Sequence, residues 1–204
     1  MTDSLSTTIA TYDQRAAFFV ARGKGGDLTR QFDAFTQRAA PHGLVLDVGC
    51  GPGWHSVELM RRGFRAIALD LSHGMLREAQ QLSVRDLVLM DMRQLPIANH
   101  SIAGLWVSAS FLHVPRDDAD ATLREFARVL KNGGVMYLGV KGGEGERFGN
   151  PLDDLLRYFI YWTEENLDAR LRAAGFELVE SWVNTPEVKA TRADTWINRV
   201  VVKK

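Results

Sequence analysis

The sequence lacks the features that mark secreted and membrane-spanning chains. Cys50 is the only cysteine in 204 residues, which excludes an internal disulfide and fits a reducing compartment. No apolar run approaches the ~20 residues that a bilayer-spanning helix needs. The Thr/Ser-rich N-terminus shows neither the basic region nor the apolar region of a signal peptide. These absences predict a soluble, cytoplasmic protein with no membrane partner.

An excess of charge of one sign is also missing. Lys+Arg and Asp+Glu both number 25, so the formal net charge is zero. A neutral chain without a basic block gives no electrostatic reason to expect nucleic acid as a partner. The five histidines show no H-x-x-x-H pairing and there is one cysteine, so we predict no metal site.

Short apolar runs alternate with helical patterns along the whole chain. Strands are predicted at 44–48, 65–69, 87–90, 101–107, 135–140, 176–183 and 196–202. Helices are predicted at 5–20, 27–39, 54–62, 72–81, 115–130, 152–161 and 163–175, with a glycine-rich loop at 142–149. This alternation predicts an α/β fold with a doubly wound, mostly parallel sheet. The two helices before the first strand predict an N-terminal helical cap or lid over 1–42, on a core of 43–204 in a single domain.

Residues 44–56 combine a predicted buried strand, three alternating glycines (Gly49, Gly51 and Gly53) and the start of a helix. A glycine turn between strand and helix lets the backbone approach a nucleotide-like ligand. A dinucleotide site has the pattern G-x-G-x-x-G, but Trp54 stands where its third glycine would be. Asp47 precedes the turn, and a carboxylate there disfavours a pyrophosphate and favours a sulfonium or an ammonium. The stretch therefore predicts a nucleoside that carries positive charge.

Acidic residues end the next two predicted strands. Asp70 lies 23 residues after Asp47, close to the ~20-residue offset at which a carboxylate binds ribose hydroxyls. Asp91 followed by Met92 offers an acceptor for an amino group and an apolar surface for a flat ring. Because the carboxyl ends of parallel strands share one edge, we expect these side chains to converge there with Ser108.

The order of these motifs resembles the class I S-adenosylmethionine (SAM)-dependent methyltransferases of small-molecule type. Residues 47–53 (DVGCGPG) resemble the glycine motif of that family. Four further blocks follow in the same order: 68–76 (ALDLSHGML), 90–96 (MDMRQLP), 111–114 (FLHV) and 128–134 (RVLKNGG). The resemblance covers about 40–183. It implies a Rossmann-like, seven-stranded sheet with its last strand antiparallel, and methyl transfer from SAM to a small-molecule acceptor.

By matching position, the resemblance also implies site residues. Cofactor contacts are expected from Asp47, Gly49, Cys50, Gly51, Gly53, Asp70, Leu71, Met75, Asp91, Met92 and Ser108, and from Tyr12 of the lid. In this scheme the glycines lie against the methionyl part, Asp70 holds the ribose, and Asp91 with Met92 frames the adenine. His113 is the candidate general base, with a packed histidine as the alternative. Lys141 and Glu144, in the glycine-rich loop, are expected to be solvated, with contact to the substrate as the alternative.

Two other functions stay open at this point. One is an NAD-dependent oxidoreductase, against which Trp54 and Asp47 argue. The other is a SAM-binding protein without catalysis. Residues 108–111 (SASF) differ from the Asn/Asp-Pro-Pro-Tyr/Phe motif of methyltransferases that act on amides and nucleobase amines, which removes that substrate class.

Overall fold

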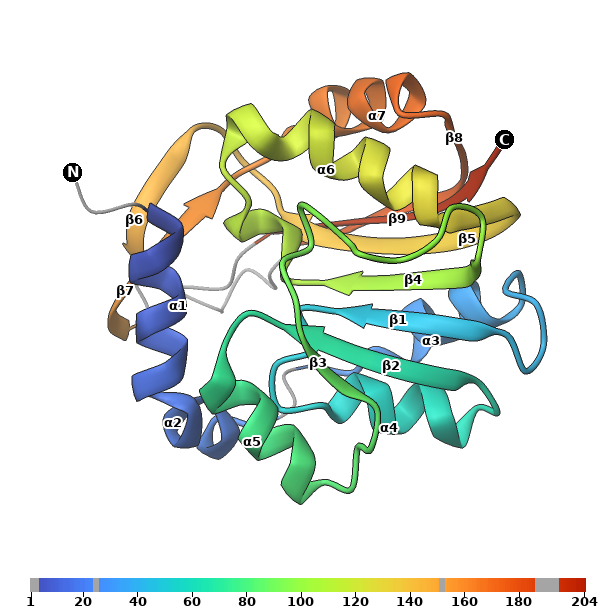
Figure 1. The fold of residues 1–204 in the computed structure, drawn as a ribbon. Coiled ribbons are helices and arrows are strands. Elements are labelled where there is room, and N and C mark those ends of the chain that lie inside the picture. Colours follow the sequence, from blue (N-terminus) through green and yellow to red (C-terminus); the bar gives the residue numbers. More distant parts are fainter. Residues whose placement is uncertain (1–3, 24–25, 151–152, 186–194) are drawn as a thin grey trace.

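A single seven-stranded sheet forms the centre of the protein, in the order β3-β2-β1-β4-β5-β9-β8 (Figure 1). The computed structural model describes residues 4–23, 26–150, 153–185 and 195–204. The strands of the sheet are β1 (Leu44–Val48), β2 (Arg65–Asp70), β3 (Leu87–Leu89), β4 (Ile102–Ser108), β5 (Leu130–Lys141), β8 (Phe176–Asn184) and β9 (Trp196–Lys203). β9 runs antiparallel to both of its neighbours, and the pairs among β1 to β5 are parallel. The predicted doubly wound sheet with an antiparallel last strand is confirmed.

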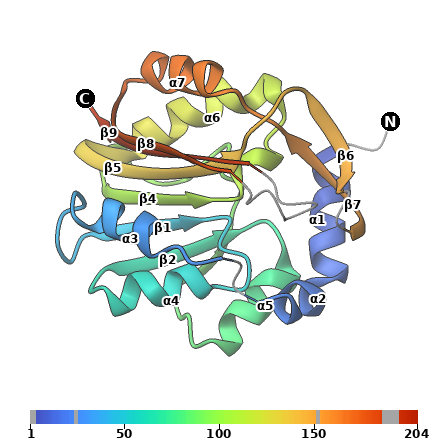
Figure 2. The ribbon, with the colours of Figure 1, turned by 180° about the vertical axis from the view of Figure 1, so that it is seen from behind.

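Helices cover both faces of this sheet. They are α3 (Thr29–Thr36), α4 (Trp54–Arg61), α5 (His73–Gln81), α6 (Arg116–Val129) and α7 (Glu164–Ala173). Phe32 and Phe35 of α3 pack with Trp106 on one face of the sheet. The ribbon of α3 on this side of the sheet can be followed in Figure 2. Phe126 of α6 and Leu167 of α7 belong to the core on the opposite face. Because helices bury both faces of the sheet, the cavity described below lies at the carboxyl ends of the strands.

The predicted helix over 5–20 is two helices in the structure, α1 (Ser4–Gln14) and α2 (Ala16–Ala21). The break falls at Arg15, whose backbone leaves the helical region at φ −117° and ψ 20°. α1 packs along a strand of the hairpin described next and also contacts α5, and α2 contacts α5 as well. The single-helix prediction was wrong because the backbone turns at Arg15, which the periodicity alone does not reveal.

A two-stranded antiparallel hairpin stands apart from the main sheet. It consists of β6 (Glu146–Asn150) and β7 (Asp153–Ile160). The helix predicted at 152–161 is therefore wrong, although residue 152 lies outside the described residues. The loop predicted at 142–149 is confirmed for 142–145 and wrong for 146–149, which belong to β6. The apolar run at the end of β7 is too short to distinguish a strand from a buried helix by periodicity. Pairing with β6, for example Phe148 opposite Tyr158, provides the backbone partners that stabilise the strand.

α1, α2 and the hairpin gather at the edge toward which the parallel strands point (Figures 1 and 2). Asp13 fixes the helical cap to α5, because its Oδ1 accepts hydrogen bonds from Ser72 Oγ at 2.7 Å and from the Gly74 backbone at 2.8 Å. Thr11 Oγ1 donates to the Leu156 carbonyl of β7 at 2.6 Å. α1 is thus attached to the start of α5 on one side and to the hairpin on the other. Within the described part of the chain, no helix is both long and apolar enough to cross a bilayer.

Candidate functional site

A cavity of about 640 Å³ lies between the carboxyl ends of the strands, the helical cap and the hairpin. This is the edge at which an open parallel sheet binds its ligands. Ten of the residues predicted for the site line the cavity: Tyr12, Gly49, Cys50, Gly51, Asp70, Leu71, Met75, Met92, Ser108 and His113. The structure therefore brings together side chains that are separated by a hundred residues in sequence.

The glycine turn is held against the end of β2. The backbone N–H groups of Gly49 and Cys50 both donate to the Leu69 carbonyl, at 2.8 and 2.9 Å. Gly49 has φ +70°, and a Cβ at this position would lie 2.3 Å from Ser110 Cβ. Only glycine satisfies both requirements, the left-handed backbone and the close approach. The turn exposes bare backbone to the cavity as a result.

Asp70 ends β2 beside this turn. Its Oδ2 accepts a hydrogen bond from the Gly51 N–H and its Oδ1 accepts one from the Ser72 N–H, both at 2.9 Å. Burial raises the pKa of Asp70, and these backbone hydrogen bonds oppose that rise. A carboxylate offers about four acceptor positions, so two further hydrogen bonds from a ligand diol are available to it.

Three predicted cofactor residues are not part of the cavity lining. Asp47 is buried and its Oδ2 accepts from Ser56 Oγ at 2.6 Å; burial raises its pKa to about 7. Gly53 adopts φ +87° before α4, where a Cβ would meet Ala79 Cβ at 2.9 Å. Asp91 forms an ion pair with Arg93 at 2.8 Å. The three residues order the loops around the cavity, and the cofactor contacts proposed for them stay predictions.

His113 is buried and its protonation is fixed by its two partners. Its Nδ1 lies 2.5 Å from the Tyr158 carbonyl, and its Nε2 lies 2.9 Å from the Tyr12 hydroxyl. A carbonyl only accepts, so Nδ1 carries the proton and Nε2 accepts from Tyr12. The pKa of His113 is lowered to about 3, chiefly by burial and also by the nearby charges of Arg157 and Lys141, while the hydrogen bond to the Tyr158 carbonyl acts in the opposite direction. The imidazole is therefore neutral at physiological pH.

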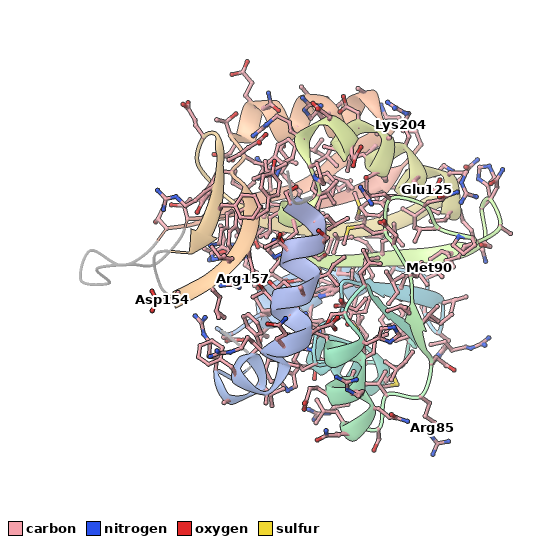
Figure 3. All side chains as sticks on the ribbon, turned by 60° about the vertical axis from the view of Figure 1, so that its left-hand side comes forward. Arg85, Met90, Glu125, Asp154, Arg157 and Lys204 are labelled. Atoms are coloured by element: carbon pink, nitrogen blue, oxygen red, sulfur yellow. The ribbon has the colours of Figure 1, made fainter. Side chains whose placement is uncertain are left out.

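The sequence analysis favoured solvation for Lys141 over contact with the substrate, and it missed Arg157. Lys141 ends β5 and Arg157 lies on β7; both line the cavity, and their exposed fractions are 4% and 5%. The expectation that Lys141 is solvated was wrong, whereas Glu144 is exposed. Figure 3 shows Arg157 on β7 beside α1. The position of Lys141 at the end of a predicted strand was a signal for it. Arg157 was hidden by the incorrect helix assignment.

The comparisons with known proteins agree with this arrangement. Residues 45–134 match the family model of a methyltransferase domain. The biotin biosynthesis bifunctional protein BioHC of Cellvibrio japonicus is 29% identical over 180 residues, which cover 85% of this chain and 34% of that protein. The malonyl-[acyl-carrier protein] O-methyltransferase of Hamiltonella defensa is 37% identical over 93 residues, which cover 45% of this chain and 35% of that protein. The chain thus spans about a third of the length of these relatives.

A solved structure extends the similarity to the whole fold. The 1,6-didemethyltoxoflavin-N1-methyltransferase of Burkholderia thailandensis, with 1,6-didemethyltoxoflavin and S-adenosylhomocysteine bound, has a TM-score of 0.77 at 20% identity and covers 100% of this chain and 92% of that chain. The matched domain holds the glycine turn, Asp70 and Ser108 on the strands that the sheet order places side by side. Residues 45–134 are thus similar to a methyltransferase domain, and the fold of the chain is that of a solved methyltransferase.

Proposed function

We propose that the protein transfers a methyl group from SAM to a small-molecule acceptor. The observation that carries the proposal is one continuous cavity that is lined by the glycine turn and Asp70 and also by residues of α1, α2 and the hairpin. SAM, when bound, supplies a methyl group on a sulfonium, so that the bond to the acceptor forms as the carbon–sulfur bond breaks and its electron pair stays on sulfur.

The residues at the sheet edge fit this cofactor. A side chain at position 49 would be blocked by Ser110, so the backbone itself forms that wall and leaves room for the aminoacyl part of the cofactor. Asp70 has the acceptor positions for the two ribose hydroxyls. Met92 supplies polarisable apolar surface for the adenine. In this proposal the Tyr12 side chain of α1 covers the bound cofactor in the cavity.

The chain's own contribution to the reaction is to orient two ligands and to exclude water. The rings of Tyr12, Phe19 and Phe159 line the cavity from the cap and from the hairpin. His113 donates to β7 and accepts from Tyr12 of α1. We propose that it acts as a positioning residue rather than as a general base, because a group with a pKa of about 3 accepts protons poorly at neutral pH.

The names of the relatives do not identify the acceptor of this chain. The names of its relatives describe an O-methyltransferase for malonyl-[acyl-carrier protein] and an N1-methyltransferase for 1,6-didemethyltoxoflavin. One fold thus serves different acceptor atoms, and the atom must be set by the residues of each acceptor compartment. The size of the cavity and the zero net charge favour a small molecule over nucleic acid.

Calorimetric titration with S-adenosylhomocysteine (SAH), the demethylated product of SAM, tests the cofactor assignment. We expect Asp70→Ala to weaken SAH binding at least tenfold, which corresponds to about 1.4 kcal/mol. Asp86→Ala is the matched control, because Asp86 is exposed and does not line the cavity. Unchanged SAH affinity in the Asp70 variant would contradict the ribose assignment.

Two further measurements separate the alternatives. Titration with NADH should give no saturable binding, and binding of NADH in preference to SAH would favour an oxidoreductase. Methyl transfer from labelled SAM should appear with at least one member of a metabolite panel. Tight SAH binding without transfer to any acceptor would favour a SAM-binding protein without catalysis.

A further inference from the structure

A row of polar side chains crosses β4, β5 and β9, which lie side by side in the sheet (Figure 1). Ser108 ends β4 and lines the cavity. It pairs with Gly139 of β5, which in turn pairs with Asn198 of β9. Paired residues of neighbouring strands present their side chains on the same face of the sheet. Position 139 has no side chain, so the space between Ser108 and Asn198 is open to a group from elsewhere on that face.

The hydroxyl of Tyr137 fills this space. A Cβ at position 139 would lie 2.6 Å from Tyr137 Oη, so the glycine admits the hydroxyl between its two neighbours. Tyr137 Oη donates to Asn198 Oδ1 at 2.8 Å, and it also forms a hydrogen bond with the Ser108 side chain. Tyr137 and Asn198 are each 2% exposed. Burial raises the pKa of Tyr137, so its hydroxyl keeps its proton at physiological pH.

The direction of each hydrogen bond in this row follows from one backbone carbonyl. Asn198 Nδ2 lies 3.1 Å from the Trp196 carbonyl, and a carbonyl only accepts, so the amide is oriented with its Oδ1 toward Tyr137. That Oδ1 accepts the single proton of the Tyr137 hydroxyl. Tyr137 can therefore only accept from Ser108, and the single proton of the Ser108 hydroxyl is used in that bond. The Ser108 hydroxyl is left with lone pairs alone to offer to the cavity.

A group that only accepts hydrogen bonds distinguishes the two charged groups of an amino acid. An ammonium carries only N–H donors, whereas a carboxylate carries only acceptors and is disfavoured beside Ser108. The aminoacyl part of the cofactor is proposed above to lie against Gly49, and a Cβ at that position would lie 2.3 Å from Ser110 Cβ. The end of β4 is therefore adjacent to the glycine turn, within reach of the same part of the ligand.

We propose, on the basis of the function proposed above, that Tyr137 and Asn198 are positioning residues that hold the Ser108 hydroxyl as a hydrogen-bond acceptor for the amino group of the cofactor. Neither of them lines the cavity, so they act on the cofactor through Ser108. The row fixes the direction of the hydroxyl before the ligand arrives, which reduces the cost of ordering it on binding. The carboxylate of the aminoacyl part points away from Ser108 in this arrangement.

Calorimetric titration with SAH and with its deamino analogue, in which hydrogen replaces the amino group, tests the proposal. The readout is the preference for SAH, which is the ratio of the two dissociation constants within one variant, so a general loss of affinity cancels. We expect the parent to prefer SAH by about tenfold or more, because hydrogen bonds to charged groups are among the stronger ones. Ser108→Ala removes the acceptor and should lower the preference by about fivefold or more. Ser101→Ala is the matched control, because Ser101 precedes the opposite end of β4, donates to the Ala98 carbonyl and does not line the cavity.

Substitutions of the two positioning residues test the direction of the hydrogen bonds. Tyr137→Phe frees the Ser108 proton to face the cavity and should lower the preference for SAH by about threefold. Asn198→Leu leaves the Tyr137 proton without its acceptor and should lower the preference in the same way. Asn198→Asp retains an oxygen that accepts from Tyr137, so it should keep the preference of the parent.

Each outcome decides the proposal. Equal affinity of the parent for SAH and for the deamino analogue would overturn it, as would a preference that survives Ser108→Ala. A preference that is lost in Ser108→Ala but is unchanged in both Tyr137→Phe and Asn198→Leu would refute the positioning roles. If Tyr137→Phe does not fold, the two Asn198 variants decide. Failure of the parent protein to bind SAH would instead refute the proposed function, so the two failures are distinguishable.

Discussion

Replacement of His113 by glutamine should remove a pH dependence of stability that the buried imidazole imposes on the fold. In the native protein the ring is neutral, because burial lowers its pKa to about 3. In the unfolded chain the same group has a pKa of about 6.5. Between these values the unfolded state binds more protons than the native state, so the free energy of unfolding falls as the pH falls.

The size of the effect follows from the two pKa values. Between pH 7.5 and pH 5.0 the His113 contribution should lower the free energy of unfolding by about 2 kcal/mol, and any native pKa below about 4 gives nearly the same figure. Glutamine does not titrate, so the variant lacks this contribution. The buried Asp47 acts with the opposite sign: its native pKa is raised to about 7, and its contribution to stability is lost as the pH rises toward that value.

Urea unfolding of both proteins at four pH values between 5.0 and 7.5 measures the effect. The difference between parent and His113→Gln cancels the shared contribution of Asp47. In a plot of the free energy of unfolding against pH, a constant offset between parent and variant reports only the hydrogen bonds lost to Tyr12 and Tyr158. If the two plots stay parallel down to pH 5.0, the imidazole titrates normally in the native state. That result would refute the argument and restore His113 as a candidate general base.

Three other substitutions examine the glycine turn and the attachment of α1 to α5. Gly51→Ala should lower the free energy of unfolding by about 1 kcal/mol, because Gly51 has φ +53° and open space surrounds the new Cβ. Gly49→Ala should lower it by about 2 kcal/mol more, because the new methyl group meets Ser110. Equal urea midpoints of the two variants would contradict the argument that Gly49 approaches Ser110 too closely for a side chain. Asp13→Ala removes the acceptor of two hydrogen bonds and should cost about 1–3 kcal/mol. Hydrogen exchange should then accelerate in α1 and α2 but not in α6, and unchanged protection of α1 would contradict the proposed anchor.

Much of the cofactor side could be predicted because its determinants are local in sequence. Gly49 and Gly51 stand in one short motif, and the register of β1 with β2 places Asp70 beside it. Parallel strands bring their carboxyl ends to a common edge whatever the loops between them do. For this reason Met92 and Ser108 were also placed at the cavity from the sequence alone.

The acceptor side depends on contacts between distant segments, which no local pattern records. The backbone turn at Arg15 lies in a segment whose packing on α5 and on the hairpin is set by residues far along the chain. The apolar run of β7 suits a strand or a helix equally, and its pairing with β6 decides between them. Lys141 is buried because the hairpin and its Phe159 ring close over it. His113 is neutral because it is buried, and the carbonyl of Tyr158, a residue of the same hairpin, accepts the hydrogen bond from its Nδ1.

The β6–β7 hairpin enters the chain after β5 and ends before α7, without pairing with any strand of the seven-stranded sheet. Its sequence is therefore constrained by the cavity, by α1 and by its own pairing, but not by the register of the sheet. Substitutions at positions 157 and 159 can alter the wall of the cavity while the glycine turn and Asp70 remain intact. The part of the lining on the hairpin can thus diverge at a different rate from the part on the sheet, without a change of fold.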